Sequence, residues 1–138
     1  MRVFFDPSAL AKRYVDEAGT AQVLDWCDRA GELVLAVTAV PELISAFCRL
    51  RREGRISPSQ YRKLKAELMA DLADALICEL TPEVVQRTVD LLESYPLCGM
   101  DAIHVAAALS SRAEVFVSAD ARQCAAARGA GLNVPALA

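Results

Sequence analysis

The sequence lacks the clusters of cysteine and histidine that form zinc sites and redox pairs. It contains one histidine, and its five cysteines are odd in number and widely spaced, with no C-x-x-C pair. A zinc site, a redox pair and a disulfide framework are therefore not indicated, and we expect reduced cysteines in a cytoplasmic protein. No apolar run is long enough to span a membrane, and Asp6 comes too early for a signal peptide. We therefore expect no association with a membrane.

Positive charge is also scarce over most of the chain. The net charge is −3, which argues against a protein that binds nucleic acid over its whole surface. Much of the positive charge lies in one basic stretch: Arg49, Arg51, Arg52, Arg55, Arg62, Lys63 and Lys65. This stretch is either a solvated helical hairpin or a local phosphate-binding flank.

Apolar residues, in contrast, make up 54% of the 138 positions. A chain of this length forms one domain with a real core, which we place at 1–138. Some of the apolar excess is expected to meet a partner or a second copy of the chain.

Short apolar runs alternate with helical patterns along the chain. Runs at 3–5, 33–37, 77–80 and 115–117 predict strands, and 132–134 could add a last one. The patterns between them predict helices, and Thr38 is expected to cap the helix that carries Pro41 and Glu42. The predicted fold class is therefore α/β, a sandwich with a short, mainly parallel sheet flanked by helices.

Four acidic residues are placed where strands are expected to lead into helices. They are Asp6, Glu42, Asp101 and Asp120. Such positions gather in one crevice at the carboxyl ends of parallel strands. Two like charges at about 4 Å cost roughly 4 kcal/mol at an effective dielectric near 20, so the cluster calls for a cation. Oxygen-only ligands suit Mg²⁺ or Mn²⁺.

Each acid also has an ordinary structural interpretation. Asp6 and Asp120 could cap the helices that follow them, and Glu42 could be solvated. Asp101 opens an almost wholly apolar helix with no Lys or Arg nearby, so it needs another partner. The argument therefore rests on the four together.

Three further polar residues lie close to these acids in the sequence. His104 is expected to hydrogen-bond near Asp101 rather than to bind metal. Ser8 and Ser118 would either hold a metal-bound water or phosphate, or cap helices.

The order of the motifs resembles that of PIN-domain ribonucleases, with the VapC-type toxins of toxin–antitoxin pairs as the most similar group. The motifs span residues 4–20, 41–43, 97–106 and 117–120, almost the whole chain. Pro7 and Ser118 depart from the residues that are commoner in the family. Neither change should harm the site, since a proline fits the start of a helix and the hydroxyl is kept.

The resemblance implies a PIN-like three-layer sandwich and a metal-dependent endoribonuclease. Asp6, Glu42, Asp101 and Asp120 would be both the catalytic and the metal-binding residues, with Mg²⁺ or Mn²⁺ as cofactor. The implied partners are an RNA substrate and a small cognate antitoxin protein, and we expect a homodimer. We expect the antitoxin to dock on the helices that carry Leu10, Tyr14, Phe47 and Leu50.

Three other functions compete with this one. The first is a catalytically inert PIN-like module that binds RNA or protein, and the intact acid set argues against it. The second is a phospho-accepting switch, which needs paired acids after the first strand and a late lysine, whereas no lysine follows Lys65. The third is a DNA nuclease of related fold, which would be longer. The sequence leaves open which RNA is cut, at which bond, and whether one or two metals bind.

Overall fold

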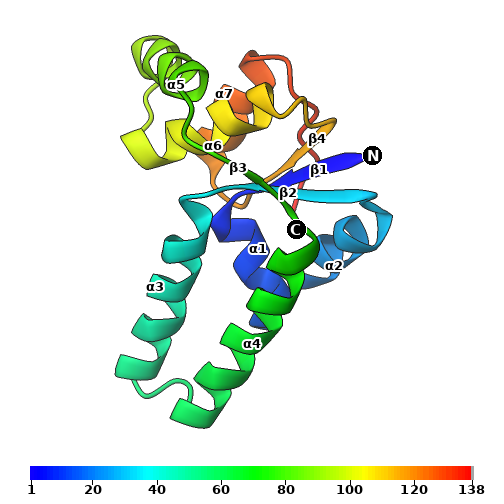
Figure 1. The fold of residues 1–138 in the computed structure, drawn as a ribbon, viewed down its shortest axis with the longest axis vertical. Coiled ribbons are helices and arrows are strands. Elements are labelled where there is room, and N and C mark those ends of the chain that lie inside the picture. The colour runs from blue at the N-terminus through cyan, green and yellow to red at the C-terminus, as the bar shows by residue number, and fades with distance from the viewer. Residues whose placement is uncertain (138) are drawn as a thin grey trace.

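The computed structural model describes residues 1–137, in which four strands form one sheet that seven helices flank (Figure 1). The strands are β1 (Arg2–Phe5), β2 (Glu32–Ala36), β3 (Leu76–Cys78) and β4 (Val115–Val117). The helices are α1 (Pro7–Tyr14), α2 (Thr20–Arg29), α3 (Ala39–Arg52), α4 (Pro58–Asp74), α5 (Pro82–Ser94), α6 (Gly99–Ser110) and α7 (Ala121–Gly129).

The sheet has the order β3-β2-β1-β4, and all three strand pairs are parallel. The predicted α/β fold class is confirmed, and β3 and β4 are the two edge strands. The optional last strand is reduced to a single parallel bridge between Val115 and Asn133. Because parallel strands all point the same way, the segments that leave β1, β2 and β4 start from one edge of the sheet.

Two apolar cores lie on opposite faces of the sheet, which makes the fold a three-layer sandwich (Figure 1). Phe4 and Phe116 of neighbouring strands stack with ring centroids 5.6 Å apart and pack under α5, α6 and α7. Val3 and Phe5 point to the other face, with α1 to α4. This alternation follows from the period of two in a strand, and it explains why short runs that are apolar at every position are buried here.

The start of each helix shows which capping residues act as the sequence suggests. Ser57 forms a full capping box with Gln60, and Thr81 caps α5. Thr38 stands at the N-cap position of α3, but the prediction that its side chain caps the helix is wrong. Its backbone is helical, and its buried Oγ1 has no hydrogen-bond partner among residues 1–137. A helical ψ points the side chain away from the free N–H groups that a cap would satisfy.

A polar clamp holds the hairpin of α3 and α4 against α1. Asp71 of α4 accepts hydrogen bonds from the Arg13 guanidinium at 2.8 and 3.2 Å and from the Tyr14 hydroxyl at 2.6 Å. Burial alone would raise the pKa of Asp71, but the Arg13 and Tyr14 hydrogen bonds outweigh it and hold that pKa below its ordinary value. The hairpin is thereby fixed beside α1, where it forms one wall of the groove described below.

Two expectations about the whole chain can be compared with the structure. All five cysteines are free, as expected for reduced thiols. Within residues 1–137, no helix has both the length and the apolar character to cross a membrane.

Candidate active site

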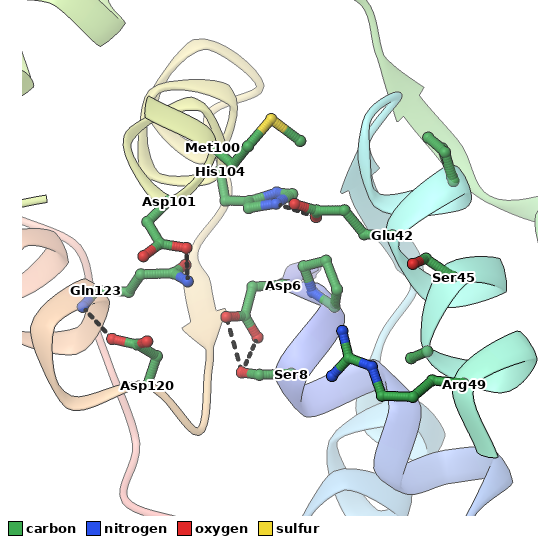
Figure 2. A pocket seen from close by; sticks show the side chains of 13 residues that line it. Asp6, Ser8, Glu42, Ser45, Arg49, Met100, Asp101, His104, Asp120 and Gln123 are labelled. Carbon is green, nitrogen blue, oxygen red and sulfur yellow. Dashed lines mark hydrogen bonds and ion pairs between the residues drawn. The ribbon is translucent and has the colours of Figure 1, made fainter. Parts of the chain in front are cut away.

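The four predicted acids line one pocket of about 500 Å³ at the edge of the sheet where β1, β2 and β4 end (Figure 2). Asp6 follows β1, Glu42 lies in the first turn of α3, Asp101 in the first turn of α6, and Asp120 just before α7. The structure therefore brings together residues that lie up to 114 positions apart in the sequence, on four separate segments.

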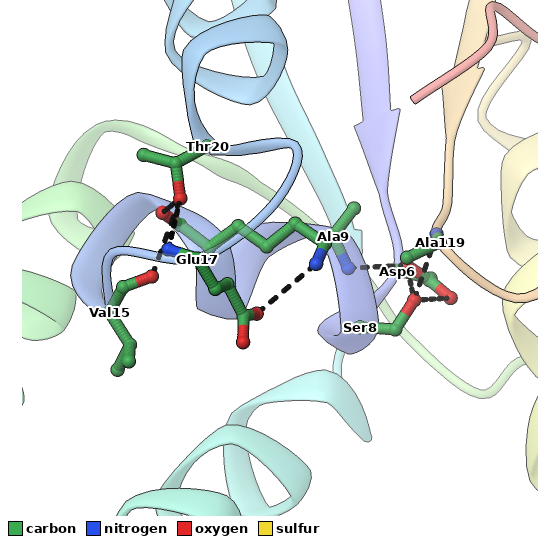
Figure 3. Close-up of polar contacts among 8 residues, drawn as sticks. Asp6, Ser8, Ala9, Val15, Glu17, Thr20 and Ala119 are labelled. Atoms are coloured by element: carbon green, nitrogen blue, oxygen red, sulfur yellow. Dashed lines mark hydrogen bonds and ion pairs between the residues drawn. The ribbon is translucent and has the colours of Figure 1, made fainter. Parts of the chain in front are cut away.

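Asp6 is the most buried of these acids, with none of its surface exposed. It accepts hydrogen bonds from the Ser8 hydroxyl at 2.8 Å and the Ala9 N–H at 2.9 Å (Figure 3). It also accepts one from the Ser118 hydroxyl at 2.7 Å. Burial raises the pKa of Asp6, although the hydrogen bonds from Ser118, Ala9 and Ser8 act in the opposite direction. The hydrogen bonds thus hold the carboxylate in a fixed orientation, while its burial removes the solvation that would stabilise its charge.

Both serines connect Asp6 to the loop after β4. Ser8 Oγ accepts from the Ala119 N–H at 3.1 Å, and Ser118 Oγ accepts from the Asp120 N–H at 3.0 Å. Their hydroxyls donate to Asp6 and accept from the backbone at once. They therefore orient the Asp6 carboxylate and tie the loop to it, a role that sequence spacing alone did not separate from helix capping.

Glu42 is paired with the only histidine. His104 Nε2 lies 2.6 Å from Glu42 Oε2, and His104 is 1% exposed while the Glu42 side chain is 28% exposed. An ionised carboxylate can only accept, so Nε2 is the donor. The expectation that His104 bonds near Asp101 is wrong, because its ring reaches across to α3. The glutamate is accordingly fixed at the pocket instead of being merely solvated.

Asp101 and Asp120 are linked through the first turn of α7. Gln123 Nε2 donates to Asp101 Oδ1 at 2.9 Å, and the Arg122 and Gln123 N–H groups donate to Asp120 Oδ1 at 2.9 and 3.0 Å. Asp120 therefore caps α7 and lines the pocket at the same time. The spacing suggested that Asp101 follows a strand, and this expectation is wrong. The helix that carries it, α6, follows α5 across residues 95–98. Packing of α6 against β2 places it here.

Three polar residues of the pocket, Ser45, Arg49 and Gln123, were not placed there from the sequence. Gln123 is 3% exposed, and its position three residues after Asp120 fits a capping box, which would have suggested a different role. Arg49 was grouped with the basic stretch, although it lies seven residues after Glu42 and so on the same face of α3. That spacing is the signal that could have placed Arg49 in the pocket.

The donor types in the pocket fit a hard divalent cation. Carboxylate oxygens from four segments share it, and the buried Oε1 of Gln123 has no hydrogen-bond partner within the described residues. Oxygen-only sets of this kind suit Mg²⁺ or Mn²⁺. Across residues 1–137, however, no three His, Cys, Asp or Glu side chains are grouped closely enough to hold an ion as they stand. The pocket therefore fits a divalent cation in the type of its ligand atoms and in its location, but its carboxylates are not yet arranged around an ion.

The His104–Glu42 pair leads to a first prediction. If the resemblance holds and Glu42 takes part in RNA cleavage, replacing His104 by leucine should lower the cleavage rate roughly 10- to 100-fold, the usual effect of losing a group that orients a functional carboxylate. His104→Gln, which keeps an N–H donor, should recover part of the loss. Cleavage rates across a Mg²⁺ titration measure the effect, and melting curves control for folding. Full activity of the leucine variant would show that the pair serves packing alone.

Comparison with known families gives one match that covers most of the chain. Residues 3–129 match the PIN domain. Among curated proteins, Ribonuclease VapC45 of Mycobacterium tuberculosis (strain CDC 1551 / Oshkosh) is 30% identical over 111 residues, which cover 78% of this chain and 75% of that protein.

Solved structures show the same fold. PAE2754 from Pyrobaculum aerophilum superposes with a TM-score of 0.72 at 20% identity, covering 97% of this chain and 83% of that one. A toxin–antitoxin complex from Klebsiella pneumoniae superposes with a TM-score of 0.71 at 17% identity, covering 97% and 96%. At these identities the structures support the fold, which confirms the PIN-like sandwich predicted from the sequence.

Proposed function

This chain belongs to the PIN-domain family, and we propose that its acidic pocket makes it a metal-dependent endoribonuclease, the toxin of a toxin–antitoxin pair. The similarity to a VapC ribonuclease over three quarters of both chains supports the ribonuclease toxin. We assign the whole chain, 1–138, to this one domain.

The observation that carries the proposal is the convergence of Asp6, Glu42, Asp101 and Asp120 on one pocket from four segments. Each carboxylate is oriented by a donor: serine hydroxyls hold Asp6, His104 holds Glu42, Gln123 holds Asp101 and the first turn of α7 holds Asp120. We assign all four to the binding of Mg²⁺ or Mn²⁺. A divalent cation bound there would lower the pKa of a water and offset charge on the phosphoryl oxygens.

The protein's own groups contribute position and electrostatics. No side-chain nucleophile is required when water attacks the phosphodiester, so the carboxylates need only fixed places around the reacting phosphate. The second candidate, an inert PIN-like module, would not need four acids held in one pocket by separate donors. We therefore rank it below the nuclease.

We also propose an antitoxin as the regulatory partner. A groove of about 360 Å³ lies between α1 and α3 and shares Pro7, Ser8, Glu42, Ala46 and Arg49 with the acidic pocket. The apolar part of its lining is Ala11, Val15, Leu43, Ala46, Phe47 and Leu50. A partner segment in this groove would run directly to the carboxylates, so that one contact could both anchor the inhibitor and cover the site.

The expected wall of this groove needs correction at three positions. Leu50 lines the groove and is partly exposed, but Phe47 and Leu10 are 0% and 1% exposed and belong to the core, Phe47 lying behind the groove lining. Tyr14 is not in the lining and instead donates to Asp71 of α4. Helical periodicity gives the apolar face of a helix but does not distinguish a core contact from a groove wall.

We keep the homodimer as part of the proposal. Val85, Val89 and Leu92 are 50%, 42% and 38% exposed and lie on one face of α5 by their spacing. This face is where a second copy would pack, and sedimentation of the purified chain would measure the association.

The nuclease is tested by incubating purified protein with end-labelled cellular RNA in Mg²⁺, in Mn²⁺ and in chelator. We expect discrete new 5′ ends that require the metal and that the Asp101→Asn protein does not produce. Mapping those ends after brief expression in cells would then identify the RNA and the bond. Cleavage that survives chelator and is shared by the variant would point to a contaminant. Harmless expression without cleavage would favour the inert module.

A further inference from the structure

The acidic pocket contains one cation that has no partner in the described part of the chain. Arg49 is the only lysine or arginine among the residues that line it. Figure 2 shows its guanidinium on the side of the pocket where Asp6 and Ser8 lie. Within residues 1–137, this guanidinium makes no ion pair and no hydrogen bond.

The other arginines close by on the chain are engaged differently. Arg51 lies over the ring of Tyr61 at 4.4 Å, and Arg55 pairs with Glu53 at 3.9 Å. Neither lines the acidic pocket, and neither does Arg52. The basic stretch seen in the sequence therefore does not act as one surface, and the structure directs a single member of it to the site.

A phosphodiester needs such a group to enter this pocket. Four carboxylates repel a phosphate, because like charges a few ångströms apart interact more strongly in a partly buried pocket than in bulk water. The charge of a cation bound by the carboxylates would be largely offset by their negative charges, so little of it would remain to attract the phosphate. An arginine offers five donors in a fixed fork that matches two phosphate oxygens at once.

The position of Arg49 on α3 suits this task. Glu42, Ser45 and Arg49 follow each other at three- and four-residue spacing, so one helix face carries a carboxylate and the guanidinium into the same pocket. Arg49 also lines the adjoining groove, where the pocket opens. A chain lying in this groove would therefore contact the guanidinium and Glu42 together.

We propose that Arg49 binds the non-bridging oxygens of the RNA phosphodiester that is cut. This inference rests on the proposed ribonuclease function and adds the residue that recognises the phosphate. Bidentate binding of those oxygens fixes the phosphate relative to Asp6 and Glu42. It also opposes the charge that grows on the oxygens as water adds.

The test compares Arg49→Ala and Arg49→Lys with Arg87→Ala. Arg87→Ala is a matched control because this substitution also removes one positive charge, at a site on α5 outside the pocket. Among residues 1–137, Arg87 forms one ion pair, a surface contact with Glu83 at 3.2 Å. We expect kcat/KM to fall roughly 100- to 1,000-fold for Arg49→Ala, the range for losing a preorganised donor to a developing oxyanion. Arg49→Lys should recover only part, since it keeps charge without the fork.

Binding is measured separately, in the Asp6→Asn background and in chelator, so that it does not depend on turnover. Arg49→Ala should weaken binding of single-stranded RNA and reduce the slope of log affinity against log salt by about 0.7, the value for one phosphate contact on a single strand. Arg87→Ala should leave that slope within error. Melting curves confirm that each variant is folded.

Two outcomes separate the two proposals. If the wild type cuts RNA and Arg49→Ala matches Arg87→Ala in both kcat/KM and salt slope, the role of Arg49 is overturned while the nuclease stands. If the wild type cuts no RNA, the nuclease fails, and the binding comparison still decides Arg49: an unchanged slope overturns its phosphate contact.

Discussion

Replacing Asp6 by asparagine is expected to abolish RNA cleavage and to raise the melting temperature of the metal-free protein at neutral pH. Activity should fall at least roughly 100-fold. Substituting a residue that only orients a metal ligand costs up to about that much, so loss of a ligand should cost more. Asparagine keeps an oxygen for the Ala9 N–H, and the serine hydroxyls that now donate to Asp6 can also accept. The variant therefore preserves shape and removes a buried charge.

The expected gain in stability follows from the burial of Asp6. Its pKa is raised above the ordinary 3.8, so the folded protein holds the proton more tightly than the unfolded chain does. Stability from this group is full below pH 3.8 and is lost as the pH rises through the folded-state pKa. Above its folded-state pKa the wild type bears the whole cost of the buried charge, whereas the asparagine variant bears none at any pH.

Relief of this cost should be about 1–3 kcal/mol, or a rise of about 3–10 °C in melting temperature for a domain of this size. The gain should shrink as the pH falls through the raised folded-state pKa of Asp6, and it should be gone below pH 3.8. Saturating Mg²⁺ or Mn²⁺ should narrow or reverse the difference, because only the wild type gains the full metal-binding energy. Thermal unfolding across pH, in chelator and in metal, measures all three effects.

Asp101→Asn is the matched control for this experiment. Repulsion among the acids would also be relieved at Asp101, but this residue is only half-buried and its Oδ1 accepts from Gln123. We therefore expect Asp101→Asn to lose activity with a smaller gain in stability than Asp6→Asn. A lower melting temperature for Asp6→Asn in chelator would show instead that the charge of Asp6 stabilises α1 as a cap, and that its burial carries no net cost.

Much of the fold followed from local patterns in the sequence. The runs Val3–Phe5 and Val115–Val117 are apolar at every position because both faces of each strand are covered, and this predicted a parallel sheet. Thr38 was misassigned because a side-chain type that favours caps says nothing of its own backbone angles. The segment 132–134 was overestimated because an apolar pattern does not reveal how long strand pairing continues past a sheet edge.

The site was predictable in its acids and not in what holds them. Asp6 and Asp120 stand next to strand ends, where topology alone brings them together. Glu42 and Asp101 reach the pocket on helices, and their partners His104 and Gln123 come from elements that only tertiary packing places nearby. Spacing along the chain reports neighbours on one helix, so it pointed His104 towards Asp101 and left its contact with α3 undetected.

The groove provides the second large effect: Leu50→Asp should free the toxin from its inhibitor. Leu50 lines the groove between α1 and α3, about two turns along α3 from Glu42. A partner segment packed on it would have to bury a new carboxylate without a counter-charge. Losing an apolar anchor in this way costs about 2–4 kcal/mol, or roughly 30- to 1,000-fold in affinity.

The measurement is the ratio of cleavage with and without the proposed antitoxin, which would be recovered by pull-down with the wild-type chain from the native cell. Taking the ratio removes any effect of the substitution on basal turnover. Met69→Asp is the control, since Met69 is an apolar side chain of α4 that is 41% exposed and does not line the groove. Inhibition of Leu50→Asp that matches the wild type would place the inhibitor elsewhere. Inhibition lost in Leu50→Asp but kept in Met69→Asp would place it in the groove, where it reaches both Arg49 and the carboxylates.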